Sequence, residues 1–521
     1  MNLVRFGLFF FVICFIGCSN TVSSSSGDEQ FAEENSSSSK DNGKNEGKSS
    51  SSQSSDEKSE ECVGEAGSPW DGTTAKEFAC GSGTKLSPYV ILNAEQLAHL
   101  SFIVGGNDAD YIGKYYKLGA DILLNDGKVI NDKGALVADS SKLHKWTPIG
   151  NSSVAFSGHF DGNGYTISGL FVNTTSTHNG LFGNVSGSVS NLTVENSWVT
   201  GGKFTGGIVG LNIGTLENLK NKAAVIGNDD CTGGVVGISQ STESKKTAVV
   251  NNATNYGIIS GTKNVGGVAG EAWNTKIDSA RNFASVNGNK YVGGIIGKAG
   301  YNSVLVRYFI TANNSQNYGE ILGKEYVAGF AGLCGDQSCT SSSYSLECGN
   351  LSNIGNSGLI IAENNVGGIA ETLCRGTIKS IRNTGNIEGI NYVSGLFGSA
   401  NYSTTTSLYN TGDVVGSKYV GGIIGYNKEG VTSAAYSTGK VDGDSLVGLM
   451  IGYNYNTTMA DYYYLEQDEL EPFGENNGGG VATPKTASEM KTEDFAELVG
   501  EDFVYDSGLN DGYPVLSWEV E

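Results

Sequence analysis

The chain has 521 residues, with 76 glycines, only 6 prolines and a formal net charge of −22 at pH 7. The absence of a Gly-X-Y period excludes collagen, a hydrophobic content of 38% argues against a wholly disordered chain, and the negative charge argues against nucleic acid as a partner. Most of this charge lies at the ends: residues 19–61 carry −6 and residues 466–521 carry −13, whereas residues 62–465 carry −4. The nearly neutral, polar body suits uncharged partners such as neutral glycans, or none.

Residues 1–17 have the features of a secretion signal. Arg5 precedes an apolar run over residues 6–16, which is too short to span a bilayer as a helix. Cys18 follows Gly17 directly, and this arrangement resembles the lipobox of bacterial lipoproteins, in which the cysteine is acylated after cleavage. The resemblance implies a membrane anchor at Cys18, and Ser19 resembles the residue found in lipoproteins sorted to the outer membrane. We therefore expect the chain at the outer membrane or cell surface. A plain secretory signal is the alternative.

Residues 18–61 form a linker in which three runs of four serines lie among charged residues, Asn and Gly. Such a segment cannot bury enough apolar surface to offset its conformational entropy, so we expect it to be disordered. Its expected role is a tether between the membrane and the folded body.

Residues 62–145 are expected to form an N-terminal cap. The pattern predicts a strand over 89–92, a helix over 94–104 with Leu97, Leu100 and Ile103 on one face, and a strand over 115–124. A cap of this kind would protect the open edge of a following sheet.

Residues 146–465 repeat a box of small-Gly-apolar-apolar-Gly. Gly234 and Gly294 occupy the second position in two clean copies. The base period is 27 residues, with insertions of 6, 8 and 12, and three boxes depart from the pattern at Ala328, Glu371 and Ser394. The second box position falls at residues 180, 207, 234, 267, 294, 329, 368, 395, 422 and 448.

Each unit holds about three short strand-like runs separated by Gly and Asn, without helical spacing. One unit cannot bury its apolar side chains alone, whereas stacked units can pair each strand with its equivalent in the next. The sequence therefore predicts an all-β parallel β-helix, or β-solenoid, of about ten coils, with Asn and Gly at the corners and the possibility of Asn ladders. A propeller would need about 40 residues and four strands in each blade.

The boxes resemble the GLUG motif of bacterial surface and secreted proteins. Residues 146–150 and 156–170 are similar to the segment that opens such arrays, and residues 510–518 are similar to their end. The resemblance implies the solenoid architecture but no particular activity, because the family includes adhesin-like proteins and the motif also accompanies peptidases. The acidic segment 466–521 is expected to form a C-terminal cap, with a helix-like stretch over 486–499 that contains Met490, Phe495 and Leu498.

Seven cysteines follow Cys18, in a compartment where disulfides persist. We expect Cys62 to pair with Cys80, Cys334 with Cys374 on the adjacent coil, and Cys339 with Cys348 across the 12-residue insertion. Cys231 would then be a free, buried thiol. The alternative, a zinc site built from the last four of the paired cysteines, lacks the usual CxxC spacing.

The repeat body lacks the motifs of common catalytic or metal sites. It has no HExxH, no Gly-x-Ser-x-Gly with a plausible set of partners, and only one adjacent acidic pair, Asp229-Asp230, which suits a solvated turn. We therefore expect no catalytic residues, no metal and no cofactor.

Aromatic residues recur just before the box, at equivalent positions that would stack along a solenoid. This stripe is a candidate for binding sugar rings or another protein, and the alternative is that its rings only stack on one another. We expect a surface lipoprotein with a non-catalytic binding or adhesion role toward polysaccharide or cell-surface components. The alternatives are a polysaccharide-degrading β-helix enzyme and a purely structural envelope protein. The stripe consists of Phe204, Tyr291, Tyr326, Tyr392 and Tyr419.

Overall fold

The computed structural model describes Cys62 and residues 67–243, 246–302, 307–340, 347–467 and 470–520. The expected signal peptide, Cys18 and most of the serine-rich linker lie outside the described residues. Residues 59–521 form one compact unit.

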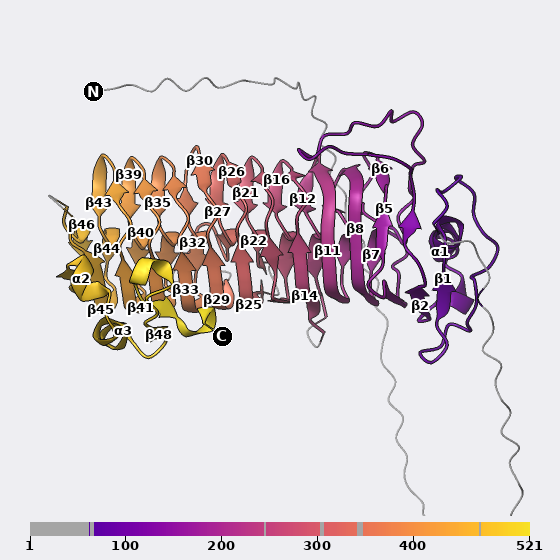
Figure 1. The fold of residues 1–521 in the computed structure, drawn as a ribbon. Coiled ribbons are helices and arrows are strands. Elements are labelled where there is room, and N and C mark those ends of the chain that lie inside the picture. The colour runs from indigo at the N-terminus through magenta and orange to yellow at the C-terminus, as the bar shows by residue number, and fades with distance from the viewer. Residues whose placement is uncertain are drawn as a thin grey trace, which may run out of the picture. The chain divides into compact units, whose positions relative to one another are not determined.

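This unit is a parallel β-solenoid, which confirms the predicted fold class (Figure 1). Two of its sheets contain one strand from each successive coil. The 11-stranded sheet consists of β7 (Phe182–Val185), β10 (Val209–Asn212), β13 (Val236–Gln240), β17 (Ala269–Trp273), β22 (Ile296–Ala299), β28 (Ala331–Cys334), β32 (Ala370–Cys374), β36 (Phe397–Asn401), β40 (Ile424–Lys428), β44 (Ile451–Tyr455) and β46 (Phe473–Asn477). The 9-stranded sheet consists of β9 (Thr205–Gly206), β12 (Asp230–Gly233), β16 (Lys263–Gly266), β21 (Lys290–Gly293), β27 (Glu325–Ala328), β31 (Val366–Gly367), β35 (Asn391–Ser394), β39 (Lys418–Gly421) and β43 (Ser445–Gly448).

A 25-stranded sheet completes the coils. It consists of β1 (Tyr89–Ile91), β2 (Tyr115–Leu118), β3 (Ile122–Leu123), β4 (His159–Asp161), β5 (Thr166–Ser168), β6 (Phe171–Asn173), β8 (Ser188–Gly201), β11 (Thr215–Gly227), β14 (Ala248–Asn255), β15 (Ile259–Ser260), β18 (Thr275–Asp278), β19 (Arg281–Asn282), β20 (Val286–Asn287), β25 (Ile310–Asn317), β26 (Ile321–Gly323), β29 (Gly349–Asn356), β30 (Ile360–Ala362), β33 (Thr377–Asn383), β34 (Ile387–Glu388), β37 (Thr404–Asn410), β38 (Val414–Val415), β41 (Val431–Ser437), β42 (Val441–Asp442), β45 (Thr458–Leu465) and β47 (Thr483–Lys485). Two antiparallel pairs lie outside these sheets: β23 (Tyr301–Asn302) with β24 (Arg307–Tyr308), and β48 (Phe503–Val504) with β49 (Val515–Leu516).

The insertions leave the strand register intact. Ile296 pairs with Ala331, and Ala331 pairs with Ala370, although these residues are further apart than one 27-residue unit. The extra residues must therefore lie in connections between strands, where added length costs little. The repeated Val, Ile and Leu side chains form one continuous core along the coils.

A ladder of buried asparagines runs along the solenoid. Each Nδ2 donates to the Oδ1 of the asparagine on the next coil at 2.7–2.9 Å. The second box glycine is required beside this ladder, because a Cβ on Gly267 would lie 2.1 Å from the carbonyl oxygen of Gly294 and 2.5 Å from Cγ of Asn282. The expected Asn ladder and the Gly box are therefore parts of one packing arrangement. The ladder consists of Asn221, Asn255, Asn282, Asn317, Asn356, Asn383 and Asn410, all fully buried.

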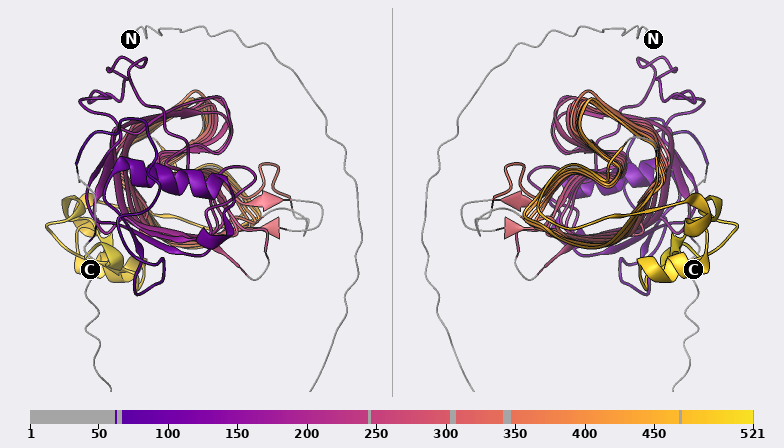
Figure 2. Two further views of the ribbon diagram at one scale, coloured as in Figure 1. Left: turned by 90° about the vertical axis from the view of Figure 1, so that its right-hand side faces the viewer. Right: turned by 90° about the vertical axis from the view of Figure 1, so that its left-hand side faces the viewer.

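The helix α1 (Ala94–Gly105) covers the N-terminal end of the coils (Figure 2). Asn93 caps it by accepting a hydrogen bond from the backbone N–H of Gln96 at 3.0 Å. Leu97, Leu100 and Ile103 are buried in the same core as the coils, as the sequence predicts. The short helix η1 (Ala109–Tyr111) follows it.

The C-terminal segment has two parts: β46 pairs with β44 and β47 pairs with β45, so they extend the last coil at the end as expected, whereas residues 486–520 pack on the flank of the coils. It contains α2 (Ala487–Met490), α3 (Glu493–Val499), η2 (Asn510–Gly512) and η3 (Ser517–Glu519). Met490 and Phe495 are buried against tyrosines of β37, β41 and β45, whereas Leu498 is 48% exposed. The segment packs here because Tyr409, Tyr436 and Tyr463 lie in register on three coils and form an aromatic surface that its apolar side chains can cover.

Two ion pairs hold this segment to the coils. Glu519 lies 2.7 Å from Arg382, and Asp502 lies 3.0 Å from Lys379. These contacts join two acidic residues of the C-terminal segment to two basic residues of β33.

All six cysteines that we expected to pair form disulfides, but two of the three pairings differ from the prediction. Cys62 bonds to Cys80 as expected, whereas Cys334 bonds to Cys348 and Cys339 bonds to Cys374. The physical reason is strand phase. Cys334 stands opposite Leu373, not Cys374, and neighbouring residues of a strand point to opposite faces. Cys231 is free and buried.

Candidate functional site

The residues of the aromatic stripe all adopt a left-handed backbone conformation at one corner of the coil. At the ten equivalent corner positions φ lies between 38° and 67°. A bulky side chain is costly in this conformation and persists only where the surroundings enforce it. The ten corner residues are His178, Phe204, Cys231, Asn264, Tyr291, Tyr326, Asn365, Tyr392, Tyr419 and Leu446.

The structure brings the stripe together in pairs rather than as one ladder. Tyr392 and Tyr419 stack with ring centroids 4.7 Å apart, and Tyr291 lies 5.2 Å from Tyr326. Phe204 contacts His178 instead. The stripe is interrupted because Cys231, Asn264 and Asn365 occupy the intervening corners.

These rings lie outside the main core, where the 9-stranded and 11-stranded sheets meet. We call this line the seam. Tyr392 and Tyr419 each form a T-shaped contact with Tyr426 from β40, with ring centroids 6.0 and 5.8 Å apart. Tyr426 in turn stacks on Tyr453 from β44, with centroids 5.2 Å apart. Sequence reasoning missed Tyr426 and Tyr453, although the repeated Gly-Tyr-Asn after two boxes was a signal for them.

The stacked rings leave mainly their edges and hydroxyl groups for a ligand. Neighbouring rings cover one another, and the ammonium of Lys418 lies over the ring of Tyr419 at 4.9 Å. In the other pair, Lys290 lies over both Tyr291 and Tyr326. The stripe is therefore better suited to hydrogen bonding through phenol groups than to stacking on a broad sugar face.

A cavity of about 370 Å³ opens at the seam beside the longest insertion. Gln337 of this insertion accepts a hydrogen bond from the Tyr291 hydroxyl at 2.7 Å and donates one to the Tyr326 hydroxyl. The disulfide between Cys339 and Cys374 joins the insertion to β32 at the cavity wall. The cavity is lined by Tyr326, Gln337, Ser338, Cys339, Asn365, Glu371, Thr372, Tyr392, Ser399, Asn401, Tyr426 and Lys428.

Glu371 is the unusual residue of this cavity. It occupies the last position of a box, which is glycine in the other copies, and only 2% of its surface is exposed. The Thr372 hydroxyl donates to its carboxyl group at 2.5 Å. Burial raises the pKa of Glu371 to about 8. The sequence marks Glu371 as a departure from the repeat but does not reveal that its side chain lines a cavity.

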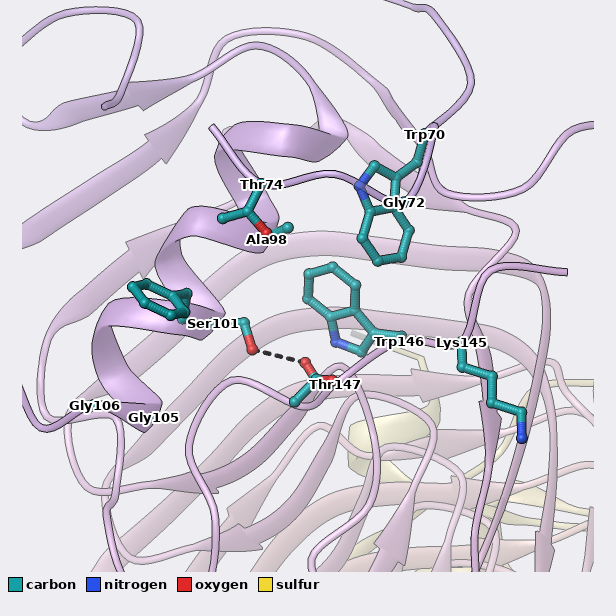
Figure 3. A pocket seen from close by; sticks show the side chains of 11 residues that line it. Trp70, Gly72, Thr74, Ala98, Ser101, Gly105, Gly106, Lys145, Trp146 and Thr147 are labelled. Atoms are coloured by element: carbon teal, nitrogen blue, oxygen red, sulfur yellow. Dashed lines mark hydrogen bonds between the residues drawn. The ribbon is translucent and has the colours of Figure 1, made fainter. Parts of the chain in front are cut away.

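A larger cavity, of about 520 Å³, lies between α1 and two tryptophans at the N-terminal end (Figure 3). Three of its polar groups are already used: Ser101 donates to the carbonyl of Thr147 at 2.8 Å, and the indoles of Trp70 and Trp146 donate to backbone carbonyls. The Lys145 side chain points away from the indoles (Figure 3). With few free hydrogen-bonding groups, this cavity is a weaker candidate for a polar ligand than the one at the seam.

The structure also bears on metal and membrane chemistry. Within the described ranges, no three His, Cys, Asp or Glu side chains gather as a metal site would require. Among the helices that the structure describes, none is long and apolar enough to cross a membrane. Of the acidic pair, Asp229 lies in the bend before β12 and Asp230 is the first residue of β12, where it pairs with Lys263 at 3.0 Å.

No protein-family model matches the chain. A stretch of 128 residues is 37% identical to the "Putative Gly-rich membrane protein" of Evansella cellulosilytica, covering 24% of this chain and 13% of that protein. A stretch of 147 residues is 34% identical to "Halomucin" of Haloquadratum walsbyi, covering 27% of this chain and 2% of that protein. The chain thus spans a small part of the length of the curated relatives it matches.

The comparison with solved structures also gives a match. It is titled a "putative immunoglobulin A1 protease" from Bacteroides ovatus, with a TM-score of 0.37 and 15% identity over 85% of this chain and 95% of that chain.

Proposed function

We propose that this chain is a surface lipoprotein whose solenoid binds uncharged polysaccharide at the seam without cleaving it. The proposal includes a lipid anchor at Cys18, an outer-membrane or cell-surface location and membership of the GLUG-type surface proteins. The relative named as a membrane protein supports the membrane association.

The chemistry of the seam cavity carries this proposal. Most of its lining consists of phenol, hydroxyl and amide groups, including those of Tyr392, Asn401 and Ser399. Groups of this kind match the hydroxyls of a neutral sugar. Lys428 is the cationic exception, and its ammonium lies 4.0 Å from the Glu429 carboxylate.

The same lining argues against glycoside cleavage. The usual mechanisms need two carboxyl groups about 5–10 Å apart, one as acid and one as nucleophile or base. Of the lining residues in the described part of the chain, Glu371 alone carries a carboxyl group. Binding is thus the simpler use of this surface.

The test is a glycan array probed with the full-length chain purified in detergent, together with an assay for new reducing ends on each glycan that binds. We expect binding to neutral glycans and no product. Product formation would favour the enzyme alternative, and the absence of binding to any glycan would favour a structural envelope role. Separately, Cys18→Ala should abolish incorporation of labelled fatty acid, whereas Cys14→Ala should not.

A further inference from the structure

Glu371 stands at the last position of a box, where the other copies have glycine. At the equivalent position on the next coil, a Cβ on Gly398 would lie 2.7 Å from the carbonyl oxygen of Tyr392 and 2.8 Å from that of Glu371. On the preceding coil, a Cβ on Gly332 would lie 2.5 Å from the carbonyl oxygen of Tyr326. A full side chain at such a position is costly, and departures of this kind concentrate at functional sites.

The Glu371 carboxyl group is buried without a cation to balance it. In the described part of the chain it forms no ion pair, and Lys428 is occupied with Glu429 and with the ring of Tyr402. The other titratable groups of the cavity are Tyr326, Tyr392 and Tyr426, whose pKa values burial raises above the usual value near 10. A buried carboxyl group among phenols and without a cation is therefore a neutral acid at pH 7.

A neutral carboxyl group offers one proton to donate. Thr372 already donates to Oε2, so the acid proton is free to lie on Oε1, which has no hydrogen-bond partner among the described residues. Glu371 lines the cavity, so the proton can be given to an acceptor there. The Oε1 atom is not fully enclosed, so a ligand oxygen would replace water as the acceptor of this proton.

The surrounding frame is fixed before any ligand arrives. The disulfides Cys334–Cys348 and Cys339–Cys374 join the 12-residue insertion to its own coil and to the next one. Gln337 links the hydroxyls of two corner tyrosines at the cavity edge. Preformed sites of this kind lose less conformational entropy on binding.

We propose that Glu371 is the hydrogen-bond donor at the centre of a subsite that holds one uncharged sugar residue through a hydroxyl, ring or acetamido oxygen. This inference rests on the proposed function and specifies the residue and the chemical class of its ligand. Because the subsite needs the acid proton, ligand binding favours the protonated state. Affinity is then constant below the pKa of the free group and falls as pH rises above it, by up to about tenfold per pH unit.

The test is calorimetric titration of the full-length chain in detergent with cellotetraose, mannotetraose and chitotetraose, and with tetragalacturonate as a charged counterpart. For the neutral sugar that binds, we expect an affinity that is nearly unchanged from pH 6 to 7 and about tenfold lower at pH 9 than at pH 7. Glu371→Gln, which keeps the shape and an N–H donor, should bind without this dependence on pH. Glu371→Gly, which restores the repeat, should bind at least tenfold more weakly, and circular dichroism checks that each variant is folded.

The outcomes separate the two proposals. If the wild-type chain binds none of the three neutral sugars, both the proposed sugar binding and the role of Glu371 are overturned. Binding by wild type that Glu371→Gly leaves unchanged, or a pH dependence that Glu371→Gln retains, would overturn only the role of Glu371. Carbon-13 NMR of the labelled glutamate carboxyl groups in the wild-type chain supplies a measurement that needs no variant: the added sugar should raise the highest glutamate pKa, and an unchanged value would overturn the inference.

Discussion

The solenoid contains two polar arrangements with opposite character, the asparagine ladder and the cavity at the seam. The ladder repeats one residue on seven coils, and each of its side-chain amides is paired with the next. The cavity is assembled from residues that do not repeat, including Glu371, Gln337 and the disulfide between Cys339 and Cys374.

This difference separates architecture from function within one repetitive chain. A residue that recurs on successive coils meets a structural requirement common to those coils, such as hydrogen bonding at a buried corner. A residue that appears once satisfies a local need. At the cavity three single events coincide, namely the longest insertion, its disulfides and a glutamate in place of glycine, and together they mark one site on an otherwise uniform rod.

The largest expected effect comes from removing the disulfide at the cavity. Its cysteines are 35 positions apart in the sequence, and the variant Cys339→Ser/Cys374→Ser should therefore lose about 4 kcal/mol of stability by the loop-entropy model. Denaturant titration measures this loss. Sugar binding should also weaken, because the insertion no longer stays at the cavity wall.

The matched control is Cys62→Ser/Cys80→Ser at the N-terminal end, where the cysteines are 18 positions apart in the sequence. It should lose about 3 kcal/mol but keep the affinity for sugar. If both double variants bind sugar equally well, the cavity does not depend on its disulfide.

A smaller loss is expected from breaking the ladder at its middle. Asn317→Ala removes a group that donates to Asn356 at 2.7 Å and accepts from Asn282 at 2.8 Å, and it leaves both neighbours with unpaired buried atoms. We expect a loss of about 3 kcal/mol with unchanged sugar affinity. Asn251→Ala, at a half-buried position outside the ladder, where the amide donates to the Glu217 carboxylate at 3.3 Å, should cost less than about 1 kcal/mol. Hydrogen exchange by mass spectrometry should locate the opening at the coils next to residue 317, and a uniform effect along the rod would contradict a local role.

The smallest effect is expected from single phenol groups. Tyr426→Phe removes one hydroxyl from the cavity and should lower sugar affinity about fivefold, which corresponds to about 1 kcal/mol, with little change in stability. Tyr256→Phe is the control, because Tyr256 stacks on Phe283 in an exposed column where phenylalanine already occurs. Equal affinities of the two variants would show that the seam phenols do not contact the sugar.

The sequence was sufficient to predict the repeating parts of the fold. The 27-residue period predicts the stacked parallel strands, because the same apolar positions must return to the same interior on every coil. The periodicity around Leu97 and Leu100 likewise predicts the helix over the N-terminal end. A repeated pattern can be recognised in the sequence because several copies of the unit show the same positions.

The sequence was less informative about the direction in which a strand residue points and about contacts between residues far apart in the chain. Cys374 lies one residue too far along its strand to face Cys334, and that single step changes the disulfide partner. The C-terminal segment covers a column of tyrosines at 409, 436 and 463, whose 27-residue spacing was visible but whose outward direction was not. Glu371 was visible as a departure, but its burial follows only from the three-dimensional arrangement.

The asparagine ladder has a consequence for how such a chain can change its length. From Asn255 through Asn383 every amide donates toward the C-terminal coil and accepts from the N-terminal one, whereas within the ladder Asn221 only donates and Asn410 only accepts. The ladder therefore has a direction, and a whole 27-residue unit can be duplicated or deleted within it while every remaining amide keeps a partner. Gene duplication or deletion in steps of one unit can thus lengthen or shorten the rod by one strand spacing, about 4.8 Å, without altering the cavity at the seam.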